Sequence, residues 1–379
     1  MFLPQKHCRT FLSNVSKIQF ASCQQKIVEP GPKAEHGESK KSTDTSSSFN
    51  DRIEDDCTRN RGDVKIGIIG GGMTPIYASL LLKQCKLIER INIADPNDEL
   101  ANAANDCSHI DTSTKIKYYG RSCLTEALHD VDIIALMDEK DFSLGKLGPF
   151  EQFSKTSSYI SKMANCMAQT CPSALVAVFA RPVTASLPMV SEVYNFYGWW
   201  DPNRIIGSCA IDAMRIESMT ANLFDLNPSY LSVPIVGGAD PCTVVPILSK
   251  AKPYNQFSPE HEAMLVRELR SADKELASSS SKGPSLSSGV AASKLLIALT
   301  GALCGRPNVT CSAYVRSDVL PVCRFFTNDL LFGRQGVEKN YGLPKVSRQA
   351  VDLIEQSIPH INDLSEMAIK IVRTDNAKK

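Results

Sequence analysis

The sequence has no apolar run long enough to cross a lipid bilayer, because the best candidate, residues 295–304, is too short and follows Lys294 directly. It also has almost no net charge, +1, which gives no electrostatic reason to expect a nucleic-acid partner. Its thirteen cysteines include no C-x-x-C pair and no Cys/His cluster. That pattern favours reduced thiols in an intracellular compartment over a zinc site or a disulfide framework. Histidine is scarce as well, with six residues, so few positions could supply an imidazole base.

Acidic residues are absent from the first 28 residues, which contain several lysines and arginines together with serines and apolar residues at roughly helical spacing. This composition predicts a mitochondrial transit peptide over residues 1–28, and hence the mitochondrial matrix; the alternative is a disordered basic tail. Residues 29–63 are rich in Pro, Ser, Thr and mixed charges and have few large apolar side chains, which predicts a disordered linker. The folded part is expected to begin near Val64.

A strand–turn–helix–strand unit begins at this point. Residues 64–69 are apolar and mostly β-branched, Gly70, Gly71 and Gly72 follow, residues 76–85 predict a helix, and residues 91–94 predict a strand that ends in Asp95. This is the first βαβ unit of a dinucleotide-binding domain, with Gly70 and Gly72 at the pyrophosphate and Asp95 near the ribose.

The dinucleotide-binding motif is incomplete, since Pro75 stands where the third glycine belongs. Proline has no N–H, so one amide that could face the pyrophosphate is lost, and its ring is expected to hold the helix off the strand. The sequence therefore predicts a folded Rossmann unit with weak or absent NAD affinity.

The remaining chain alternates buried strands and helices and then changes character. This pattern predicts a doubly wound parallel sheet over residues 64–208, followed by an α+β domain over residues 209–379. The expected strands are 131–136, 174–180, 314–316 and 329–332, and the expected helices are 148–169, one that begins at 258, 288–302 and 347–372.

Four sequence blocks carry a family resemblance: residues 106–110 (DCSHI), 212–215 (DAMR), 233–238 (VPIVGG) and 331–338 (LFGRQGVE). With them the chain resembles mitochondrial-type malate dehydrogenase, of the lactate/malate dehydrogenase family, from Val64 to Val372. The resemblance implies a Rossmann NAD domain, a mixed catalytic domain and a homodimer whose interface uses helices that begin near residues 106–110 and 212–226.

The family's catalytic residues are only partly present. Asp212 matches the acid that orients the catalytic histidine, and Arg215 matches an arginine that binds one substrate carboxylate; the alternative is that the two form a structural ion pair. The position of the histidine itself is Ala239, followed by Asp240. Alanine cannot move a proton, and Asp240 is expected to point elsewhere.

The substrate clamp departs from the family too. The mobile loop, residues 137–148, has three acids and no arginine, and Arg181 replaces an asparagine that touches substrate and cofactor. Arg181 is expected to form an ion pair with Asp212 or Asp240; the competing expectation is that Asp240 turns outward and Arg181 lies in solvent.

Two functions follow from these residues. The first is a catalytically inactive or strongly impaired homologue that acts as a structural or regulatory subunit, in a homodimer or in a heterodimer with an active paralogue. The second is an active NAD-dependent malate dehydrogenase that interconverts malate and oxaloacetate in the tricarboxylic acid cycle. A dehydrogenase for another 2-hydroxy acid would lack the same base.

Overall fold

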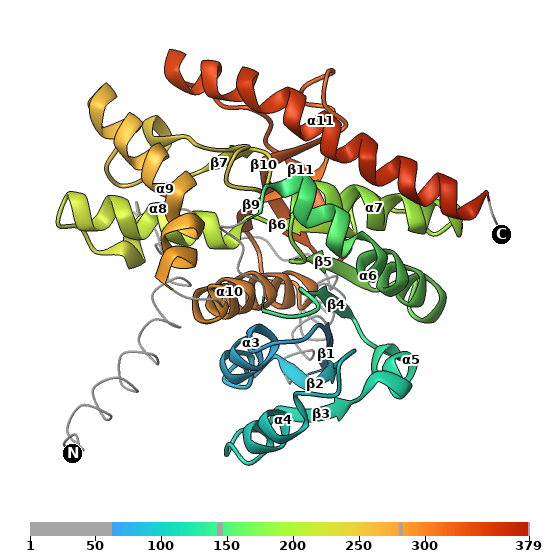
Figure 1. Cartoon of the computed structure of the whole chain (residues 1–379). Helices are drawn as coiled ribbons and strands as arrows, with labels where there is room; N and C mark the ends of the chain where they lie inside the picture. The colour runs from blue at the N-terminus through green and yellow to red at the C-terminus, as the bar shows by residue number, and fades with distance from the viewer. Residues whose placement is uncertain (1–62, 142–146, 280–282, 378–379) are drawn as a thin grey trace, which may run out of the picture.

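The computed structural model describes residues 63–141, 147–279 and 283–377 (Figure 1). The predicted transit peptide and nearly all of the predicted linker lie outside the described residues, as do residues 142–146 of the arginine-free loop. A single sheet runs through the described part, in the order β3-β2-β1-β4-β5-β6-β9-β10-β7-β8, with β11 paired to β10.

The first six strands of this sheet are parallel, which confirms the doubly wound arrangement predicted from the alternation of strands and helices. Chain order reverses between β1 and β4, where a Rossmann sheet opens its crevice. The strands are β1 (Val64–Ile69), β2 (Ile88–Ala94), β3 (Lys115–Tyr119), β4 (Ile133–Leu136), β5 (Leu175–Val178) and β6 (Ile205–Ser208).

The later strands continue the sheet in antiparallel fashion, because β9 pairs with β6. The change from parallel to antiparallel pairing therefore falls after Ser208, the end of the predicted first domain, although hydrogen bonds connect the two parts. These strands are β7 (Ile235–Gly237), β8 (Val244–Pro246), β9 (Val309–Arg316), β10 (Phe325–Gly333) and β11 (Gly336–Asn340).

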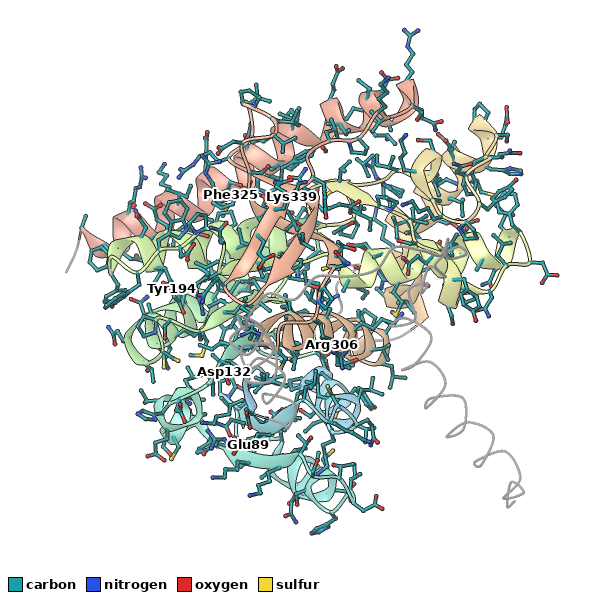
Figure 2. The ribbon with its side chains drawn as sticks, turned by 180° about the vertical axis from the view of Figure 1, so that it is seen from behind. Glu89, Asp132, Tyr194, Arg306, Phe325 and Lys339 are labelled. Atoms are coloured by element: carbon teal, nitrogen blue, oxygen red, sulfur yellow. The ribbon has the colours of Figure 1, made fainter. Side chains whose placement is uncertain are left out.

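Helices cover both faces of the sheet (Figure 1). Successive residues of β4 point to opposite faces of the sheet, as in any strand. Ile134 lies in the core that includes α6, α7 and α11, whereas Ile133 lies in the core that includes α3 and α10. Tyr194 and Phe325, labelled in Figure 2, are fully buried in the first of these cores. The helices are α3 (Thr74–Leu82), α4 (Ala101–Ser108), α5 (Leu124–Leu128), α6 (Pro149–Thr170), α7 (Val183–Phe196), α8 (Ala210–Leu223), α9 (Pro259–Ser279), α10 (Ser285–Leu303) and α11 (Arg348–Asn376).

Pro75 does not displace its helix from the sheet, so the expectation that it would is wrong. It lies in the first turn of α3, where a missing N–H costs little because helix starts leave amides unpaired in any case. Ile76 and Leu82 of α3 share a core with Ile66 and Ile68 of β1. The helix and strand therefore pack closely without the third glycine.

One helix of the described residues, α10, is long and apolar enough to cross a membrane by length and composition. The expectation that no apolar run is long enough is therefore wrong by this criterion, because it considered only residues 295–304 and not the whole helix. More than half of its most apolar window, 56%, is buried inside the protein, and α10 packs along α3 in the core. Its apolar character is therefore explained by the interior of the fold.

Candidate active site

A small cavity lies at the carboxyl ends of β4 and β5, and two of the predicted site residues, Asp212 and Arg181, line it, whereas Arg215, Gly70, Gly72 and Asp95 do not. Its volume is about 50 Å³, room for a few water molecules and far below the roughly 300–1,000 Å³ of ordinary ligand pockets. Ala239 and Asp240 line the cavity as well, so the structure brings together four residues that the sequence singled out. The other lining residues are Thr74, Met137, Asp138, Phe179, Val183, Ser208, Ile211, Pro241, Asp273, Ser288, Ala291 and Ala292.

Asp212 lies in the first turn of α8, where the helix dipole favours a carboxylate, and it is 4% exposed. Burial is the main cause that raises its pKa to about 6; the charge of Asp273 acts in the same direction, and the charges of Arg215 and Arg181 act against it. The acid that would orient a histidine is therefore present and buried, but Ala239 offers it no imidazole.

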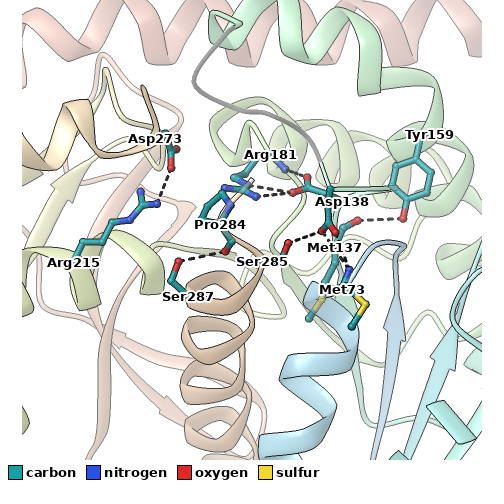
Figure 3. A network of polar contacts seen from close by, with 11 residues as sticks. Met73, Met137, Asp138, Tyr159, Arg181, Arg215, Asp273, Pro284, Ser285 and Ser287 are labelled. Atoms are coloured by element: carbon teal, nitrogen blue, oxygen red, sulfur yellow. Dashed lines mark hydrogen bonds and ion pairs between the residues drawn. The ribbon is translucent and has the colours of Figure 1, made fainter. Parts of the chain in front are cut away.

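Arg215 forms an ion pair with Asp273 of α9, with 2.7 Å between Nη2 and Oδ1 (Figure 3). The side chains are 10% and 11% exposed, so the pair is largely removed from water. Arg215 is thus part of a structural ion pair, as the alternative expected, but its partner is Asp273 rather than Asp212. A substrate carboxylate would have to compete with Asp273 for this guanidinium.

Arg181 is held by Asp138 rather than by Asp212 or Asp240, so the expected ion pair is wrong. Its backbone N donates to Oδ1 at 2.7 Å, and its Nε and Nη2 each donate to Oδ2 at 3.1 Å (Figure 3). The register explains this partner, since Leu136 of β4 lies beside Val178 of β5 and both residues follow those strand ends. The competing expectation fails as well, because the Arg181 side chain is 17% exposed.

Asp240 is buried and lines the same cavity as Asp212, so the expectation that it points elsewhere is wrong. Its Oδ2 accepts from the backbone N of Thr184 at 3.2 Å. Burial, together with the nearby charge of Asp212, raises the pKa of Asp240 to about 7, although hydrogen bonds from Thr184 oppose the shift. Ala239 beside it donates its backbone N to Thr184 Oγ1 at 3.0 Å, which fixes the β7–β8 turn.

The glycine-rich turn is covered by the protein's own chain. Gly71 donates its backbone N to the carbonyl of Asp138 at 3.0 Å, and a β-carbon built on Gly71 would overlap the carbonyl of Glu139. The Asp141 carboxylate accepts from the backbone N of Met73 at 3.1 and 3.3 Å. In a dinucleotide site the glycines allow the pyrophosphate to lie close to the backbone of this turn. Here residues 138–141 occupy that space.

Asp95, the expected ribose acid, is fully buried. Its carboxylate accepts from the backbone N atoms of Asn97, Glu99 and Leu100 at 2.6–2.9 Å, and so fixes the segment that leads into α4. With Asp141 at the turn and Asp95 facing inward, the described residues do not fit a dinucleotide in this arrangement.

Three polar residues of this site escaped the sequence reasoning: Asp138, Asp141 and Asp273. The first two lie in the loop of residues 137–148, whose three acids were assigned no partner from the sequence. Asp273 carries no signal in the sequence, because its pairing with Arg215 depends on how α9 packs against α8.

Comparison with known proteins gives a consistent picture, although no family model matches the chain. It is 31% identical to the mitochondrial malate dehydrogenase of Caenorhabditis elegans, over 78% of this chain and 86% of the other. It is 28% identical to the mitochondrial malate dehydrogenase of Pongo abelii, over 84% of this chain and 94% of the other. The crystal structure of Cryptosporidium parvum malate dehydrogenase superposes with a TM-score of 0.70 at 16% identity, over 82% and 99%.

Proposed function

The chain belongs to the malate dehydrogenase family, and from this premise we propose that it is a catalytically silent member that acts by association, as a structural or regulatory subunit. One observation carries the proposal: the cavity that contains the orienting acid Asp212 has Ala239 in its wall and no histidine among the residues that line it. A positioned general acid–base is worth about 10²–10⁴-fold in rate.

The charges of the cavity support the same proposal. Binding a dicarboxylate needs cations that are free to turn toward it, yet Arg181 and Arg215 are each held by an internal carboxylate, Asp138 and Asp273. Releasing either arginine would leave a buried acid without its partner, which costs several kcal/mol. The site therefore lacks both the base and the clamp.

Association is proposed through the helices that the family uses. On α8, Leu223 is 39% exposed and Met219 is half-buried, and both are open to a second chain. Ile216 of the same helix is fully buried in the core and is not available to a second chain. A homodimer is the proposed state, and a heterodimer with an active paralogue would use the same surface. The proposed location is the mitochondrial matrix, after the relatives named above.

The proposal is tested with purified full-length chain in an assay of oxaloacetate-dependent NADH oxidation. The expected rate is the background without protein, because two separate roles are lost. Light scattering at micromolar concentration tests the association, with a dimer expected. A monomer would remove the proposed mode of action, and turnover near that of working enzymes, on the order of 10 s⁻¹, would overturn the silence.

A second candidate, an active malate dehydrogenase with an unusual base, has one observation in its favour. Asp240 adjoins Ala239, lines the cavity, and has its pKa raised to about 7, a value suited to proton transfer at neutral pH. If Asp240 is that base, D240N will abolish turnover. The named activity of the relatives also favours this candidate.

A further inference from the structure

The Asp141 carboxylate lies at a position where this fold can bind an anion. Met73, the N-cap of α3, has no side-chain cap, and its backbone N donates to both carboxylate oxygens of Asp141, at 3.1 and 3.3 Å. The first amides of a helix lack partners within the helix and carry the positive end of its dipole. A carboxylate at this position is therefore stabilised, as a phosphate would be.

A second donor comes from a distant part of the chain. Ser285, the first residue of α10, donates its Oγ to Asp141 Oδ1 at 2.8 Å. Because α10 packs along α3 in the core, the starts of two helices meet at one carboxylate. Asp141 is thus held from both sides by groups that the fold places rigidly.

The backbone of the turn is shaped around this carboxylate. Gly72 has a φ of +68°, in the left-handed region, and a β-carbon built on it would overlap the Asp141 side chain. Asn97 fixes the neighbouring chain by donating its Nδ2 to the carbonyl of Glu139 at 2.7 Å. The glycine that would admit a pyrophosphate in a dinucleotide site admits a carboxylate of the same chain.

We infer that Asp141 is the residue that determines cofactor exclusion: its carboxylate is an internal ligand of the α3 N-terminus and keeps dinucleotide phosphates out. Two charges of the same sign cannot share these donors, and a phosphate that displaced Asp141 would leave a half-buried carboxylate without its partners. The inference rests on the proposed function, but it predicts that one substitution creates binding.

The test is a calorimetric titration of NADH into the full-length chain and into D141A, with E139Q as the matched control. Glu139 lies two residues away and makes its contacts at the turn through its carbonyl, so E139Q also removes one negative charge but leaves the α3 N-terminus occupied. We expect D141A to bind NADH about two- to fivefold more tightly than wild type, the scale of a charge placed at a helix terminus, and E139Q to match wild type.

The inference is overturned if D141A binds NADH no better than wild type, if E139Q gains as much as D141A, or if wild type itself binds with a micromolar dissociation constant. Circular dichroism checks the fold, and should D141A lose it, the isosteric D141N decides by the same criteria. Adding oxaloacetate separates this inference from the proposed function. Binding by D141A without NADH oxidation supports both. If D141A both binds and oxidises NADH while wild type does neither, the inference stands and the proposed function fails. If D141A does not bind NADH and no variant oxidises it, the inference alone fails, whereas oxidation by wild type overturns both because turnover requires bound NADH.

Discussion

Removing Asp273 should destabilise the fold by several kcal/mol, because it leaves the buried guanidinium of Arg215 without its partner. Both side chains are about nine-tenths buried, at 10% and 11% exposure, so D273A would leave a guanidinium in a largely dry site. Breaking a buried pair on one side costs about 3–5 kcal/mol. Against a total stability of about 5–15 kcal/mol, this is a large fraction.

The expected result is a fall of about 3–5 kcal/mol in the free energy of unfolding of D273A, measured by urea denaturation. The double variant R215A/D273A should lose less than the sum of the two single variants, with a coupling energy of about 1–3 kcal/mol. The exposed pair Lys155–Glu151, at 55% and 57% exposure, provides the control. K155A should change stability by less than about 1 kcal/mol.

A D273A chain as stable as K155A would show that Arg215 is not committed to Asp273. The guanidinium would then be free for a substrate carboxylate, and the argument that the clamp is lost would fail.

Two further predictions concern the acids and the glycine-rich turn. Burial raises the folded-state pKa values of Asp240 and Asp212 to about 7 and about 6, above the usual carboxyl value of about 3.9. Between these values the folded chain binds more protons than the unfolded chain, so the free energy of unfolding should fall as the pH rises. D240N should lose less stability than wild type between pH 5 and pH 8 in urea titrations, and equal losses would mean that Asp240 is ionised throughout. G72A should destabilise the fold by about 1–2 kcal/mol, because φ at this position is +68° and the added methyl meets Asp141; an unchanged urea midpoint would contradict the close packing at this turn.

Local patterns predicted six of the eleven strands in the described part of the chain, and missed β3, β6, β7, β8 and β11. The apolar β-branched run before Gly70 became β1, and Ser258 and Ser347 each accept a backbone N–H at the start of the helix predicted to follow. The short strands β7 and β8 were not expected as strands, because three residues give no periodicity and their pairing depends on distant segments.

The site was predictable only as far as it depended on residue types at single positions. The sequence placed Asp212 and Ala239 in one site, and the cavity contains both. It paired Arg181 with the wrong acid, since charge alone does not say which carboxylate lies at the neighbouring strand end. The sequence led us to expect that Pro75 would weaken NAD binding. We infer instead that Asp141 does so at the α3 N-terminus, and this contact joins segments 68 positions apart, which no local pattern predicts.

The most direct measurement is the rate of oxaloacetate-dependent NADH oxidation by wild type and D240N side by side, at equal concentrations of purified full-length protein. We expect both rates to equal the background without protein, because Ala239 cannot transfer a proton and the ion-paired arginines are not free to bind the substrate. A wild-type turnover on the order of 10 s⁻¹ that D240N abolishes would contradict the account and make Asp240 the proton-transfer base.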